Sequence, residues 1–167
     1  MKKRVISFVL ILTIIAAFSS STFAYSPVTR VNGQIWETEP NDYEEDATII
    51  LQQGTTIYPT YGALNYAGDG DHYLFQSKTT QTKKLRVGRS GGLVDVPDAY
   101  FFVGFHDLTT GEPIFTKRVL VSKGLTEPLQ LIAGHDYIIY VTVEGNDDEI
   151  QESLDNRPFR YLLALNG

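Results

Sequence analysis

The stretch AYFFVGFHDLTTGEPIFTKRVLVS, residues 99–122, decides the fold class. Two runs of β-branched and aromatic residues, 99–108 and 113–122, flank the turn-forming residues 109–112, as in two strands joined by a turn. Six further runs of this kind lie between turn-forming residues, at 61–64, 72–76, 85–88, 128–132, 137–144 and 159–165. Because no long amphipathic helix separates them, we predict an all-β fold, an antiparallel β-sandwich of about eight strands.

The run at residues 99–108 is apolar on both sides. Phe101, Val103 and Phe105 alternate with Phe102 and His106, and successive side chains of a strand point to opposite faces of the sheet. This pattern predicts a central strand whose aromatic residues pack in the core.

The first 24 residues have the pattern of a secretory signal peptide. The basic residues 2–4 precede an apolar run over residues 5–18, and the segment ends in Thr22-Phe23-Ala24, a small-x-Ala cleavage pattern. The apolar run is too short to favour a transmembrane anchor. We therefore predict cleavage after Ala24 and a secreted protein that starts at Tyr25.

Charge limits the partners of the secreted chain. Residues 1–24 contain three of the 14 Lys and Arg residues and none of the 20 Asp and Glu residues, so the remaining 143 residues carry 11 minus 20, or −9. This charge argues against nucleic acid and anionic membranes and favours cations. The chain has no cysteine, hence no disulfide. We expect a monomer with an N-terminal extension, residues 25–36, and one domain, residues 37–167.

Residues 36–46, WETEPNDYEED, are strongly acidic. In an extended chain, Glu37, Glu39 and Asn41 point to one face. Ca²⁺ takes about 6–8 oxygen ligands, so this segment supplies only part of a coordination shell. The turn Asp69-Gly70-Asp71 is the natural second element, and with Asp42 five carboxylates would meet. The alternative is a solvated acidic segment in which Asp42 only caps a helical turn over residues 43–47.

Ordered motifs extend from Glu37 to Leu165. They read Glu37-x-Glu39-Pro40-Asn41-Asp42, Ala47, Gly62-x-Leu64, Asp69-Gly70-Asp71-x-Tyr73-x-Phe75, Asp107-Leu108-x-x-Gly111, Ala133-Gly134-x-x-Tyr137 and Tyr161-x-Leu163. Together they resemble the bacterial pre-peptidase C-terminal domain, a family that includes the collagen-binding modules of bacterial collagenases. The resemblance implies a jelly-roll-like β-sandwich, usually appended to secreted peptidases, with calcium near its N-terminal edge in some members.

The resemblance also implies a ligand set for calcium. Carried over position by position, the ligands are Glu37, Glu39, Asn41, Asp42 and Asp71, with the backbone carbonyl of His72. The earlier aspartate of the calcium-binding modules matches Gly68 here, so coordination by Asp69 is expected to be shifted or absent. Collagen-binding relatives expose tyrosines on a strand where this chain has Val141 and Val143, which argues against collagen binding.

A catalytic pattern is also present. Gly88 to Gly92 fits the nucleophile-elbow pattern G-x-S-x-G around Ser90, and Asp107 and His135 follow in the order found in hydrolases. The elbow requires a helix after the serine, and residues 93–97 have no helical pattern. We therefore expect Ser90 in a glycine-rich loop, His135 in a turn, and no enzyme. The three histidines show no local metal-ligand spacing and no H-E-x-x-H pattern is present, which argues against a zinc peptidase.

Two charged clusters remain. The acidic residues between Glu144 and Asn156 indicate a solvated loop, with a helical turn at 149–154 and a second, weaker cation site as alternatives. The basic cluster Lys83, Lys84, Arg86 and Arg89 indicates a solvated strand end rather than a ligand site.

The sequence therefore predicts a secreted, non-catalytic, calcium-binding module for an extracellular protein or polysaccharide. The alternative is a structural or secretion-assisting domain that accompanies a separate secreted peptidase and binds no ligand beyond calcium.

Overall fold

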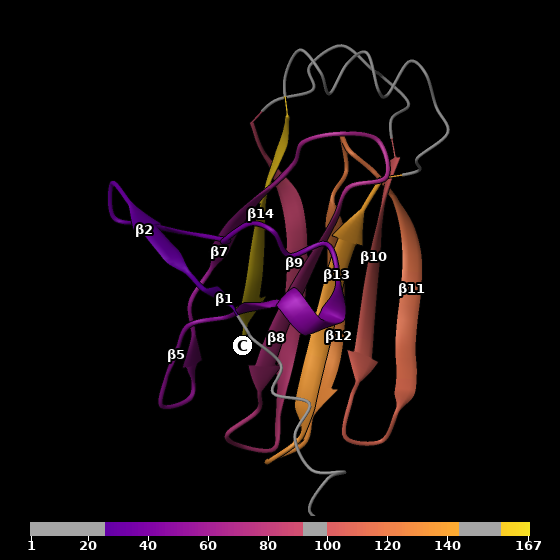
Figure 1. Ribbon diagram of the computed structural model, residues 1–167. Coiled ribbons are helices and arrows are strands. Elements are labelled where there is room, and N and C mark those ends of the chain that lie inside the picture. The colour runs from indigo at the N-terminus through magenta and orange to yellow at the C-terminus, as the bar shows by residue number, and fades with distance from the viewer. Residues whose placement is uncertain (1–25, 92–99, 144–157) are drawn as a thin grey trace, which may run out of the picture.

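The computed structural model describes residues 26–91, 100–143 and 158–167, which form two six-stranded sheets packed face to face (Figure 1). Sheet A has the order β1 (Ser26–Pro27), β4 (Thr48–Ile49), β8 (Gly70–Gln76), β13 (Asp136–Thr142), β10 (Tyr100–Asp107) and β11 (Glu112–Leu120). Sheet B has the order β12 (Leu125–Leu131), β9 (Gln81–Gly91), β14 (Phe159–Asn166), β7 (Thr60–Leu64), β3 (Gln34–Trp36) and β2 (Thr29–Val31). A small hairpin joins β5 (Gln52–Gln53) and β6 (Thr56–Ile57).

The eight long strands, β7 to β14, correspond to the eight predicted runs, and the all-β sandwich is confirmed. If the long strands β7 to β14 are numbered 1 to 8 along the chain, their order is 2-7-4-5 in sheet A and 6-3-8-1 in sheet B. This is the strand order of a jelly roll, in which all successive strands except the fourth and fifth cross between two antiparallel sheets.

The N-terminal third of the described chain differs from the prediction. The short strands β1 to β6 were not foreseen, and β1 with β4, β4 with β8, and β3 with β7 pair in parallel. The sheets are therefore mixed at this edge rather than wholly antiparallel. Strands of two or three residues are too short to show an alternating pattern, so the sequence carried no signal for them.

The helical turn predicted over residues 43–47 is a shorter 3-10 helix, η1 (Glu44–Asp46). Its N-cap residue is Tyr43, and no side chain caps it. The alternative in which Asp42 caps this turn is therefore wrong. Among the described residues, no helix has the length and apolar character that a membrane span requires. The helical turn expected at 149–154 lies outside the described residues.

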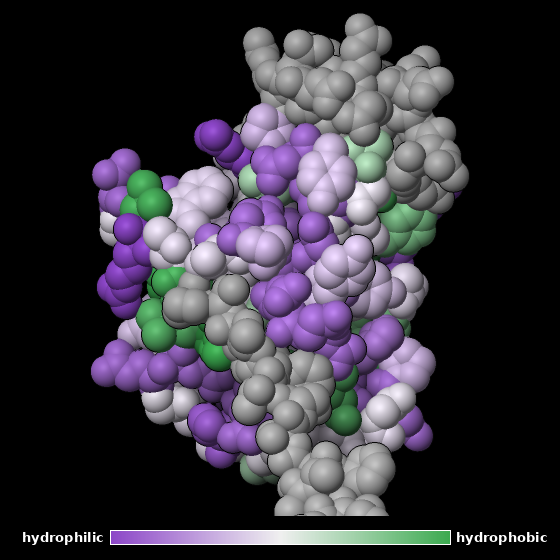
Figure 2. All heavy atoms as spheres, in the orientation of Figure 1, coloured by the Kyte–Doolittle hydropathy of each residue, from purple (hydrophilic) through white to green (hydrophobic). Residues whose placement is uncertain are grey.

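Alternation of buried and exposed residues builds the core between the sheets. In β10, Phe101, Val103 and Phe105 are fully buried, whereas Phe102 and His106 are partly exposed on the outer face of sheet A. This strand pairs with β13 on one side and β11 on the other, as predicted for a central strand. Over η1 and the adjoining loops the surface is mostly hydrophilic, with a smaller hydrophobic group near β1 and β5 (Figure 2).

The edge strands β11 and β12, which belong to different sheets, are joined by an ion pair. Lys117 in β11 lies 2.5 Å from the Oε1 atom of Glu127 in β12. Both edges also carry a proline, Pro113 and Pro128. Proline has no backbone N–H to offer a further strand.

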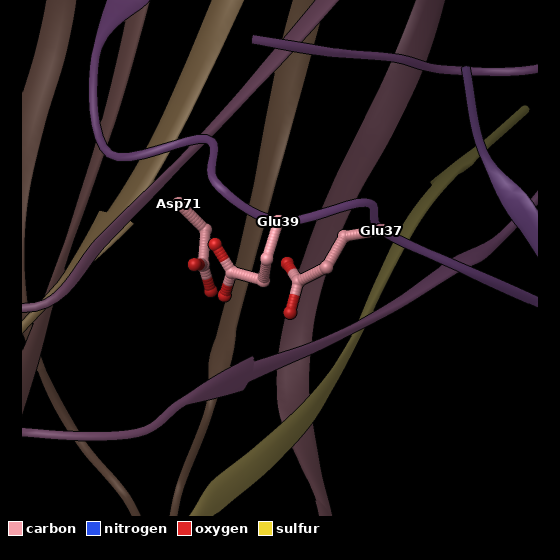
Figure 3. A group of neighbouring side chains, drawn as sticks. All are labelled: Glu37, Glu39 and Asp71. Atoms are coloured by element: carbon pink, nitrogen blue, oxygen red, sulfur yellow. The ribbon is translucent and has the colours of Figure 1, made fainter. Parts of the chain in front are cut away.

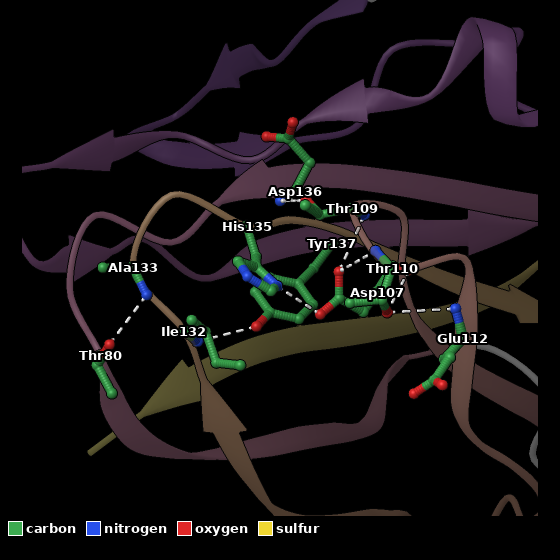
Figure 4. A network of polar contacts seen from close by, with 10 residues as sticks. All are labelled: Thr80, Asp107, Thr109, Thr110, Glu112, Ile132, Ala133, His135, Asp136 and Tyr137. Carbon is green, nitrogen blue, oxygen red and sulfur yellow. Dashed lines mark hydrogen bonds and ion pairs between the residues drawn. The ribbon is translucent and has the colours of Figure 1, made fainter.

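At one end of the sandwich, a polar network joins the β10–β11 turn to the β12–β13 turn (Figure 4). Asp107 accepts hydrogen bonds from the backbone N–H groups of Thr109 (3.0 Å) and Thr110 (3.2 Å), and its Oδ2 atom lies 2.7 Å from Nδ1 of His135. Burial raises the pKa of Asp107, but the bonds from His135 and the two amides outweigh it and leave that pKa below its ordinary value. Asp107 and His135 thus fasten two turns together.

The structure does not assemble the catalytic triad that the sequence pattern suggested. Ser90 lies within β9, which continues to Gly91, so it belongs to an exposed strand end and the expectation of a loop is wrong. Thr80 Oγ1, before the start of β9, accepts the N–H of Ala133 near His135. Ser90 is ten residues further along the chain, roughly 30 Å away at about 3.3 Å per residue of strand.

Gly62 in β7 is required by close packing. A Cβ atom at this position would overlap the phenol groups of Tyr73 and Tyr161, both fully buried. Gly88 in β9 is different, because a Cβ atom there would meet no atom within 4 Å. The two glycines therefore allow a matched test of the packing around the two tyrosines.

We expect Gly62→Ala to destabilise the protein by about 1–3 kcal/mol, the usual cost of an overpacked core. Gly88→Ala, the same change in an open position of the same sheet, should leave the free energy of unfolding almost unchanged. Urea unfolding of the two variants measures the difference, and equal stabilities would contradict the close approach at Gly62.

Candidate metal centre

Three carboxylates from two parts of the chain converge at one edge of the sandwich (Figure 3). Glu37 and Glu39 lie just after β3, and Asp71 lies in β8. One oxygen atom of each lies within 4.8 Å of the others. The backbone N–H of Glu37 donates to Tyr61 O in β7 (2.9 Å), which anchors this segment to sheet B, whereas Asp71 belongs to sheet A. The cluster therefore spans the two sheets.

Two buried tyrosines hold the carboxylates. The hydroxyl of Tyr73 in β8 donates to Glu37, and the hydroxyl of Tyr161 in β14 donates to Asp71. The two hydroxyl oxygens lie 2.6 Å apart, and the rings are perpendicular. The backbone N–H of Ala63 adds a further bond to Glu37 (2.5 Å). Tyr73 and Tyr161 stood in the motifs of the sequence, but sequence reasoning assigned them no role at the centre.

Asn41 completes the inner part of the centre. It is fully buried, its side-chain N–H₂ group lies near Glu37 Oε2 (3.5 Å) and Thr48 Oγ1 (3.3 Å), and its backbone N–H donates to Glu39 (3.2 Å). The Oδ1 atoms of Asn41 and Asp71 are buried without a hydrogen-bond partner in the described part of the chain. An unpaired buried acceptor costs about 1–3 kcal/mol, so these oxygens favour a cation as partner.

Asp42 and Asp69 form a second acidic pair beside the three carboxylates. Both oxygens of Asp42 lie 3.1 Å from the hydroxyl of Tyr66, and Asp69 Oδ2 accepts the backbone N–H of Asn65 (2.5 Å). The Oδ1 atom of Asp69 is buried and, within the described residues, unpaired. The five carboxylates expected to converge are thus divided into a group of three and a neighbouring pair.

His72 lies against the acidic segment. Its backbone N–H donates to Asn41 O (2.9 Å), and its Nδ1 atom lies 3.2 Å from the same oxygen. Its ring packs on Tyr140 on the outer face of sheet A, with a centroid distance of 5.9 Å. His72 therefore fastens the segment that carries Asn41 to β8.

Burial makes the charged forms of these carboxylates costly. Burial, with a contribution from Glu39, raises the pKa of Glu37 from 4.5 to about 7, although hydrogen bonds from Tyr73 and Ala63 partly offset the effect. Burial raises the pKa of Asp69 to about 6, and burial together with Glu37 raises that of Asp71 well above its ordinary value. A bound divalent cation would remove this penalty, because it stabilises every negative charge around it.

Comparison with known proteins adds structural neighbours. No model of a known protein family matches the chain, and no curated protein matches it. Among solved structures, it is similar to the pre-peptidase C-terminal domain of collagenase from Bacillus anthracis, with 15% sequence identity and a TM-score of 0.45 over 65% of this chain and 88% of that one. The first neighbour is of the family that the motifs resemble.

A second solved structure is PliG from Aeromonas hydrophila, a periplasmic inhibitor of g-type lysozyme. The identity is 17% and the TM-score 0.42, over 72% of this chain and 96% of that one. Both likenesses concern the fold.

The raised pKa values predict an unusual pH dependence without calcium. A carboxyl group whose pKa is higher in the folded than in the unfolded protein stabilises the fold below the unfolded pKa, and this contribution is lost as pH rises through the folded pKa. In chelator, the melting temperature should therefore fall as pH rises from about 4.5 to about 7. Glu37→Gln should reduce this fall, and Glu45→Gln, a change of an exposed carboxylate in the same segment, should not. A melting temperature that rises over this interval in chelator would contradict the pKa assignment.

Proposed function

We propose that this protein is an exported, non-catalytic β-sandwich module that binds Ca²⁺ at Glu37, Glu39 and Asp71. One observation carries the proposal: the fully buried Asp71 has an oxygen with no hydrogen-bond partner among the described residues, inside a group of three carboxylates. Asn41 and Asp69 add unpaired buried oxygens nearby. A protein buries such acceptors at a large cost unless a hydrogen-bond donor or a cation satisfies them, and the described residues supply no donor here.

The chemistry of the donors favours calcium over other metals. The donors are carboxylate and amide oxygens, which suit hard cations, and the chain has no cysteine for soft metals. Asp42 and Asp69 lie beside the three carboxylates, and the backbone carbonyl of His72 is a further candidate ligand. Together these residues offer the many oxygens that Ca²⁺ takes.

Calcium would act as a clamp between the sheets. Glu37 and Glu39 follow β3 of sheet B and Asp71 belongs to sheet A, so one ion held by all three ties the sheets together. At an extracellular affinity near ~10⁻⁴ M and ~1 mM calcium, one site contributes about 1.4 kcal/mol of stability. The signal peptide predicted for residues 1–24, which lie outside the described residues, would deliver the chain to such a calcium-rich medium.

The module would bind an extracellular protein or polysaccharide, with no catalytic role. Its alternative remains a structural or secretion-assisting domain beside a separately encoded secreted peptidase. Retention on a glycan with calcium present favours the first, and association with a secreted peptidase favours the second. The weaker cation site considered for residues 144–156 lies outside the described residues.

We expect Ca²⁺ to raise the melting temperature of the purified protein at neutral pH and a chelator to reverse the rise. Asp71→Asn should abolish the rise, and in chelator it should melt at or above the temperature of the unchanged protein, because it removes an uncompensated buried charge. Glu39→Gln should weaken the response. Glu45→Gln is the matched control and should respond fully. An unchanged melting temperature on addition of millimolar Ca²⁺ would exclude the site.

A further inference from the structure

The outer face of sheet B carries a row of four residues, called the aromatic row because two stacked aromatic side chains begin it. Trp36 in β3 lies opposite Tyr61 in β7, and their rings stack with a centroid distance of 5.2 Å and an interplanar angle of 27°. In register, the row continues through Leu162 in β14 to Gly88 in β9, where a Cβ would meet no atom within 4 Å. All four residues are partly exposed. The row is therefore a continuous strip across four strands.

Basic side chains lie on both sides of this row. Arg160, two residues before Leu162 in β14, places its guanidinium carbon 5.9 Å from the centre of the Trp36 ring. On the other side of the row, Arg86 is exposed in β9, two residues before Gly88. Lys84 is also exposed and lies two residues before Arg86. Residues two apart in a strand share a face, so these cations share the face of the aromatic row.

No carboxylate of the described residues forms an ion pair with Lys84, Arg86 or Arg160. The ion pairs of this part of the chain join Lys117 to Glu127 and His135 to Asp107. The chain has a net charge of −6, so a face with three unpaired cations in the described structure is distinct from its average surface. The interpretation of Lys84 and Arg86 as a solvated strand end does not account for the aromatic row beside them.

We propose that this face, defined by Trp36, Tyr61, Arg86 and Arg160, binds an acidic polysaccharide. The C–H face of a sugar ring packs on aromatic rings, and guanidinium groups bind carboxylates through paired hydrogen bonds. A strip that crosses four strands suits an extended polymer, whose acidic groups would reach the arginines on either side. This inference rests on the proposed function as a binding module and names its site and ligand class.

The face and the metal centre are physically joined. Trp36 directly precedes Glu37, whose N–H donates to Tyr61 O (2.9 Å). An ion that holds the carboxylate of Glu37 therefore also holds Trp36 against Tyr61. Binding of the polysaccharide should be tighter in calcium than in chelator.

Trp36 is the one tryptophan in the chain, so tryptophan fluorescence reports this face directly. The purified protein is titrated at fixed free calcium with short hyaluronan oligosaccharides, which contain uronate, and in parallel with neutral cello-oligosaccharides. We expect a saturable change with the uronate ligand, weaker at high salt, and no comparable change with the neutral one.

Variants on the two sheets distinguish binding at this face from a general effect of positive charge. Arg86→Ala should weaken binding of the uronate ligand about tenfold, as expected when an arginine that pairs with a carboxylate of the ligand is removed. Arg118→Ala removes the same charge from the outer face of sheet A, where Arg118 stacks on Tyr100, and should bind normally. Trp36→Ala should abolish binding when followed by calorimetry.

Several results would overturn the proposal. Equal responses to the charged and neutral ligands would exclude an acidic ligand, and a stronger response to single-stranded DNA would assign the face to nucleic acid. Equal losses in Arg86→Ala and Arg118→Ala would exclude this face. Each variant is also melted with and without Ca²⁺: absent glycan binding with an intact calcium response refutes this inference alone, whereas a missing calcium response refutes the metal site.

Discussion

The contact between Glu37 and Asp71 across the two sheets is the constraint on which the rest of the structure depends. The carboxylates of Glu37 and Asp71 are 34 residues apart in the sequence and are buried together. One oxygen of Asp71 has no hydrogen-bond partner among the described residues. Such an arrangement is unfavourable by itself, because burial and mutual repulsion both penalise the charged forms. The fold tolerates it because Tyr73 and Tyr161 donate to these groups from the core, and Gly62 leaves the space that their rings need.

Much of the fold could be predicted from the sequence. Strands β7 to β14 have at least five residues, enough for alternation or turn boundaries to show. The strands β1 to β6 are held by a few backbone pairs each, and nothing in two or three residues marks them. Ser90 was misplaced for a related reason: glycines that resemble a loop are also compatible with an exposed strand end, and pairing with β14 decides between the two.

The candidate site could be predicted only in part. The acidic composition of the segment around Glu37 and of the turn around Asp71 marked the residues that meet. The contact between Tyr73 and Tyr161 joins residues 88 positions apart, which no local pattern reveals. Asp42 was predicted as a calcium ligand, with helix capping as the alternative, and its hydrogen bond to Tyr66, 24 residues away in the sequence, could not be foreseen from spacing. The Trp36 row likewise draws one residue from each of four strands, so its continuity exists only in the folded sheet.

The bridged edge strands have a consequence for association between molecules. An open sandwich exposes edge strands, which can pair with a strand of a second molecule and begin fibril growth. Here Lys117 and Glu127 link the two edge strands β11 and β12 to each other, and a proline interrupts the row of backbone N–H groups along each strand. The chain has no cysteine for a disulfide, and the ion pair and the two prolines make these two edges poor templates for a further strand.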